Sequence, residues 1–89
     1  MGKTVPSYRQ ALEREIERWK GFRKGLRRKD AEAFDRMMNA CRILASAGSM
    51  ATRPILLEAM FMSLLLHQEK TITEIKAKLD KLEKQLNQP

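Results

Sequence analysis

The sequence predicts an all-α protein with three helices, two of which form a hairpin against a long C-terminal helix that extends as a coiled coil. Three stretches carry apolar residues at spacings of three and four, which is the period of one helical face. Short segments with glycine or proline separate them, and no stretch alternates apolar and polar residues as a strand does. Because 89 residues allow one modest core, we expect a single domain over residues 6–89 and a flexible tail at residues 1–5.

The first predicted helix covers about residues 6–28. Pro6 suits its first turn, where a proline removes no helical hydrogen bond. Gly21 and Gly25 each cost a helix about 1 kcal/mol relative to alanine, so we expect a kink or an end near them. The apolar face consists of Tyr8, Leu12, Ile16, Trp19, Phe22 and Leu26. This face predicts core packing, with the Trp19 indole buried against Phe61 or a neighbouring residue of the third helix.

The second predicted helix covers about residues 31–47. Asp30 is a suitable N-cap, and Gly48 is a suitable residue just beyond the C-terminus. Its inner face consists of Phe34, Met37, Met38, Cys41, Leu44 and Ala45. Residues 48–53 would then form a loop to the third helix.

The third predicted helix covers about residues 54–87 and is the longest. Its first part is apolar nearly all round, whereas its second part is charged except for one stripe. That stripe alternates the a and d positions of a heptad: Ile72, Ile75, Leu79, Leu82 and Leu86.

A helix of about 50 Å would extend beyond the first two helices, which are roughly 30 Å long, and its stripe would be exposed to water. The stripe therefore predicts a homodimer formed through these five residues. The alternative is a monomer in which Ile72, Ile75 and Leu79 cover the base of the other helices. Lys78 would attract Glu83 in a parallel pair, but Thr71 and Lys76 add no such support. The orientation of the pair is therefore open.

Positive charge is concentrated near the N-terminus. The net charge is +7, and residues 1–30 hold ten Lys or Arg against four Asp or Glu. Residues 20–29 contain six cations and no acid: Lys20, Arg23, Lys24, Arg27, Arg28 and Lys29. Such clusters suit the phosphates of DNA or RNA. Our leading hypothesis is a small, non-catalytic nucleic-acid-associated protein that contacts phosphates without reading bases.

The alternative is that the same run is a solvated helix end whose positive charge is neutralised by Asp30, Glu32 and Asp35. The protein would then be an interaction or assembly module that dimerises through its C-terminal helix and meets an acidic partner. A small all-α enzyme is a remote third possibility. Chorismate mutases, for example, build their site from inward arginine, lysine, glutamate and glutamine side chains. Here the inward polar residues are few beyond His67 and Gln68.

Several classes of site and location are disfavoured by composition. One cysteine excludes an internal disulfide and fits a reducing cytoplasm. One histidine argues against a zinc or histidine-based site, so we expect no metal and no cofactor. The apolar run is too short to span a bilayer, and Glu58 interrupts it.

Short motifs are spread along the chain: Met1-Gly2-Lys3-Thr4-x-Pro6-x-Tyr8-Arg9, the basic segment 23–28, Phe34-Asp35, Ala45-Ser46-Ala47 and Ser63-x-Leu65-x-x-x-Glu69. Through them the chain resembles a family of small, basic archaeal helical proteins with no established activity. The resemblance spans most of the chain and implies a cytoplasmic archaeal origin. It implies no catalytic or binding residue.

Overall fold

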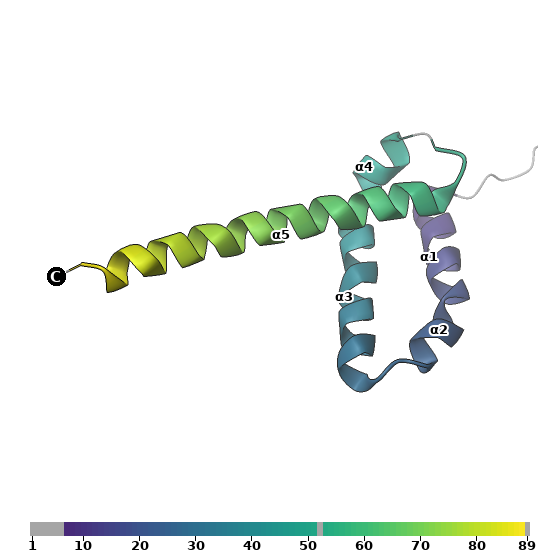
Figure 1. Ribbon diagram of the computed structural model, residues 1–89. Coiled ribbons are helices and arrows are strands. Elements are labelled where there is room, and N and C mark those ends of the chain that lie inside the picture. The colour runs from purple at the N-terminus through teal and green to yellow at the C-terminus, as the bar shows by residue number, and fades with distance from the viewer. Residues whose placement is uncertain (1–6, 52, 89) are drawn as a thin grey trace, which may run out of the picture.

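The computed structural model describes residues 7–51 and 53–88, so the tail predicted at residues 1–5 and the Pro6 helix start lie outside the described residues. The described residues form no strand and five helices: α1 (Tyr8–Arg18), α2 (Lys20–Lys24), α3 (Arg28–Ile43), α4 (Ala45–Met50) and α5 (Leu56–Leu86). The helices α1 and α2 form one arm of a hairpin and α3 forms the other (Figure 1). The long α5 crosses the end of this hairpin and projects far beyond it (Figure 1), giving extents of 74 × 32 × 15 Å. The all-α prediction and the long C-terminal helix are confirmed, but the three predicted helices are five.

The first arm is split, and it is shorter than predicted. A capping box starts α1: the Ser7 hydroxyl accepts from the Gln10 amide at 3.2 Å, and the Ser7 amide donates to the Gln10 side chain at 3.0 Å. The arm breaks at Trp19, whose amide donates to the Ile16 carbonyl three residues back. The break therefore precedes Gly21, and α2 ends at Lys24 with Gly25 as its C-cap.

The second arm starts earlier than predicted. Arg27 is the N-cap residue of α3, and its carbonyl accepts the Ala31 amide at 2.8 Å. Asp30, the predicted cap, lies in the first helical turn instead. There its carboxylate complements the helix dipole without capping the helix.

Gly48 lies inside a helix and does not end one. The predicted second helix breaks at Leu44 and continues as α4 to Met50. Gly48 is buried, and a Cβ at this position would lie 2.5 Å from the hydroxyl oxygen of Tyr8. The glycine is therefore required for close packing between α4 and α1.

The core lies where α5 crosses the hairpin. Leu12, Met60 and Cys41 are its largest fully buried side chains, and Phe34, Met38, Ala40, Ala45 and Leu64 complete the cluster. The Cys41 thiol donates weakly to the Met60 carbonyl at 3.8 Å, which confirms Cys41 as a buried core residue. Beyond Leu64, every side chain of α5 is exposed.

Candidate assembly and nucleic-acid interfaces

The basic run lies at the turn of the hairpin, at the end remote from α5 (Figure 1). Three of its six cations lie in α2, one is the N-cap residue of α3, and two lie in the first turn of α3. All six side chains are exposed: Lys20, Arg23, Lys24, Arg27, Arg28 and Lys29. The turn thus brings the six predicted residues to one end of the molecule.

Three of the six cations are paired with carboxylates. Arg23 forms a bidentate pair with Asp35, with both distances at 2.8 Å. The other two pairs are Lys20 with Glu17 and Arg28 with Glu32, both at 3.3 Å. Two of these three carboxylates, Glu32 and Asp35, are among the acids that the sequence suggested as partners.

The other three cations, Lys24, Arg27 and Lys29, make no ion pair with the carboxylates of residues 7–51 and 53–88. Arg27 and Lys29 lie at the N-terminus of α3, where the helix dipole disfavours a cation by about 0.3–1 kcal/mol. Helix stability therefore does not account for them. The same helix end presents backbone amides, which favour an anion.

Two arginine–carboxylate forks join the arms of the hairpin. Near α5, Arg42 of α3 holds Glu13 of α1 at 2.7 and 3.0 Å. Near the turn, Arg23 holds Asp35. Hydrogen bonds from the arginines lower the pKa of both carboxyl groups, and they raise the pKa of both guanidinium groups.

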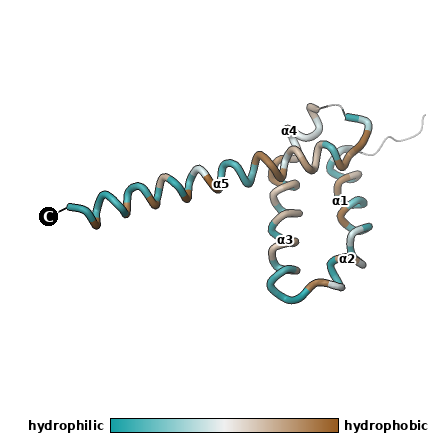
Figure 2. Tube along the Cα trace, in the orientation of Figure 1, coloured by the Kyte–Doolittle hydropathy of each residue, from teal (hydrophilic) through white to brown (hydrophobic). Residues whose placement is uncertain are grey.

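The predicted dimerisation residues form a continuous exposed stripe on α5. Ile72, Ile75, Leu79 and Leu82 are each 52–56% exposed, and Leu86 is 84% exposed. Figure 2 shows hydrophobic positions that recur along the otherwise hydrophilic outer half of α5. The same a and d positions continue toward the hairpin through Leu65 and Phe61, which are also exposed.

This stripe lies on a different face of α5 from the one that contacts the hairpin. The buried face includes Ala59, Met60, Ser63 and Leu64. At about 100° per residue, the stripe that starts at Phe61 is centred roughly a third of a turn away. Most of the stripe therefore lies away from the hairpin of its own chain, although Phe61 and Ile72 line hollows that they share with hairpin residues.

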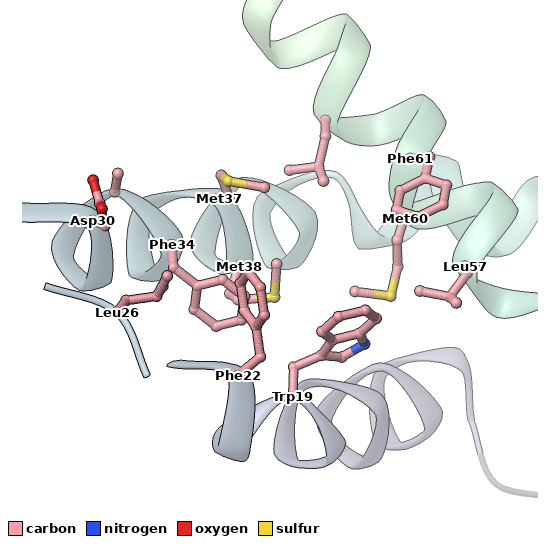
Figure 3. Close-up of a pocket in the computed structure, with 12 residues that line it drawn as sticks. Trp19, Phe22, Leu26, Asp30, Phe34, Met37, Met38, Leu57, Met60 and Phe61 are labelled. Carbon is pink, nitrogen blue, oxygen red and sulfur yellow. The ribbon is translucent and has the colours of Figure 1, made fainter. Parts of the chain in front are cut away.

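An apolar groove opens where the stripe meets the hairpin (Figure 3). It encloses about 370 Å³ between the first arm, α3 and α5. Trp19 is half-buried on its wall, not fully buried as predicted, and its ring packs edge-to-face on Phe22 at 5.6 Å. The lining residues are Trp19, Phe22, Leu26, Asp30, Ala33, Phe34, Met37, Met38, Leu57, Met60, Phe61 and Leu64.

Phe61 belongs to both the groove and the stripe. Phe22 and Met37, on the two arms of the hairpin, are exposed beside it. One apolar surface thus runs from the hairpin along α5. The sequence predicted the stripe but not the groove, because a groove depends on how α5 crosses the hairpin.

Groups suited to metal or nucleophilic chemistry are sparse in the described part of the chain. Within residues 7–51 and 53–88, no group of three His, Cys, Asp or Glu side chains could hold a metal ion. Burial raises the pKa of the Cys41 thiol, which disfavours the reactive thiolate. His67 and Gln68 lie beside Thr71 and Ile72 at a second hollow. No described helix is long and apolar enough to cross a membrane.

A family model described as Domain of unknown function (DUF8156) matches residues 1–89. No curated protein and no solved structure matches the chain.

Proposed function

We propose that this chain, which belongs to the family described as Domain of unknown function (DUF8156), is a non-catalytic assembly module that self-associates through α5. The exposed heptad stripe carries this proposal. Among the described residues, the protruding half of α5 extends beyond the core and leaves its stripe side chains more than half exposed. A second stripe is the simplest surface that would bury it.

The free energy available to self-association can be estimated from Leu79 and Leu82. Their side chains are 56% and 55% exposed. About half of the roughly 1.5–3 kcal/mol for burying a leucine therefore remains to be gained at each. Over two copies, the four leucines would contribute about 3–6 kcal/mol, or about a hundredfold to ten-thousandfold in Kd.

Sedimentation equilibrium at micromolar concentration should report about twice the chain mass of 10.3 kDa. Changing Leu79→Lys together with Leu82→Lys should raise the Kd by the factor estimated above. Thr73→Lys with Ala77→Lys is the matched control, because these exposed positions lie outside the stripe. A parent protein that stays monomeric, or whose mass is unchanged by the stripe variant, would refute self-association through α5.

A second function, contact with nucleic-acid phosphates, is favoured by one specific observation. Lys24, Arg27 and Lys29 are exposed and unpaired among the described residues, and Arg27 and Lys29 lie at the N-terminal end of α3. Cations placed where the dipole disfavours them suit an external anion. We rank this function second because carboxylates already pair with the other three cations of the run.

A further inference from the structure

We propose that two copies pair their α5 helices antiparallel, about a twofold axis between Ile72 and Ile75. In this arrangement Leu82 and Leu86 of each copy cover the open side of the apolar groove of the other. This inference rests on the proposed self-association. It adds the orientation, the register and the segment that covers the groove.

The register follows from the spacing of the stripe. From Phe61 to Leu86 the a and d positions are separated by four, three, four, three, four, three and four residues, so the pattern is the same in both directions. In an antiparallel pair each a position lies opposite a d position. The opposed positions are Phe61 with Leu86, Leu65 with Leu82, Gln68 with Leu79, and Ile72 with Ile75. No apolar position of the stripe is left without a counterpart.

The groove favours this orientation over a parallel one. Antiparallel pairing brings Leu82 and Leu86 of the second copy beside Leu65 and Phe61, where the groove opens. Parallel pairing would place Phe61 against Phe61 and carry those leucines far from both grooves. A chain cannot use its own leucines, because Leu86 lies about 33 Å beyond Leu64 along a straight helix.

Charge distribution also favours the antiparallel pair. Residues 1–60 hold 13 cations and 7 acids, whereas residues 61–89 hold 5 and 4. Antiparallel pairing places each basic hairpin beside the nearly neutral half of the other copy. The charged positions that flank the stripe do not distinguish the two orientations. Glu69 would face Lys76 in the antiparallel pair, and Lys78 would face Glu83 in a parallel one.

This geometry has a consequence for the basic turns. The hairpin lies about a third of a turn from the stripe, and the twofold axis is perpendicular to the plane of the two paired helices. Both hairpins therefore project to the same side of the dimer. Met60 of one copy lies opposite residue 87 of the other, so the hairpins are separated by about 40 Å along the helices.

Disulfide cross-linking tests the register. We would mix two single variants, Gln68→Cys and Leu79→Cys, with a size tag on one of them. Antiparallel pairing predicts a mixed cross-linked dimer and little cross-linking of either variant alone. The parent protein is the control, because its own thiol, Cys41, is only 1% exposed.

A second measurement is independent of any change in the stripe. A spin label at Asn87→Cys should give a distance between the two labels of about 40 Å in the antiparallel pair, and about 10 Å in a parallel pair. Labels at about 10 Å, or self-cross-linking of each cysteine variant alone, would overturn the antiparallel pairing and leave self-association intact. A monomeric parent would overturn both.

Discussion

Charge reversal at the basic turn is the sharpest test of nucleic-acid contact. The structure selects Lys24, Arg27 and Lys29 for reversal to glutamate, because they lack a carboxylate partner among the described residues. Reversing the paired cations would also break the ion pairs that they form. A loss of binding could then come from the lost phosphate contacts or from the broken ion pairs. The residues therefore left unchanged are Lys20, Arg23 and Arg28.

The expected magnitude follows from the number of unpaired cations. Three per copy give six per dimer, and the slope of log affinity against log salt is about −0.9 per phosphate contact. Full engagement of a dimer predicts a slope of about −5, so that binding weakens roughly a thousandfold between 50 and 200 mM salt. A single turn predicts a slope of about −3. Binding should depend little on sequence, because phosphate contacts do not read bases.

Fluorescence anisotropy with duplex DNA, single-stranded DNA and RNA at several salt concentrations would measure these slopes. The charge-reversed turn should lose detectable binding while remaining helical. The matched control is the triple variant Lys70→Glu, Lys81→Glu and Lys84→Glu, because it makes the same change in net charge on the exposed face of α5. Equal binding by the reversed turn and the parent, or an equal loss in the control, would show that the turn is only a solvated end of the hairpin.

Two further predictions concern the hairpin itself. Gly48→Ala should lower the free energy of unfolding in urea by about 1–3 kcal/mol through overpacking, and Tyr8→Phe in the same chain should recover part of it. The reason is that the Tyr8 hydroxyl, which is buried without a described partner, is the nearest atom to the new Cβ. If the effects of the two substitutions on the free energy of unfolding were additive, this contact would be contradicted. Arginines lower the folded-state pKa of Glu13 and Asp35. The two ionised carboxylates stabilise the folded state, and this contribution should be complete above about pH 5. It should be lost as pH falls below about 4, through the lowered folded-state pKa values. Glu13→Gln with Asp35→Asn should flatten that decline, and an unchanged decline would contradict it.

Some structural features were readable from the sequence because they depend on neighbours along the chain. The spacing of Ile72, Ile75, Leu79 and Leu82 defines one face of any helix that contains them. Ser7 and Gln10 form a capping box whose Ser-x-x-Gln spacing is visible in the sequence, although we placed the helix start at Pro6. The clustering of cations in residues 20–29 is likewise independent of the fold.

Other features could not be read from local patterns. The helices break at Trp19 and Leu44, where neither glycine nor proline marks an end. Gly48 matched the pattern of a helix terminator, yet it is required by its contact with Tyr8. Glycine suits both the end of a helix and a close contact between helices, so only the position of α1 beside α4 shows which role Gly48 has.

The sequence by itself determined the helical class, the exposed stripe and the location of the basic run. The tertiary structure decided that Arg23 is paired, because Asp35 lies twelve residues from Arg23 and reaches it only when α3 folds back on α2. It also decided that a groove opens beside Phe61, because α5 crosses the end of the hairpin (Figure 1). Helical periodicity arises from bonds between residues four apart, whereas pairing and cavities depend on contacts between segments distant in the chain.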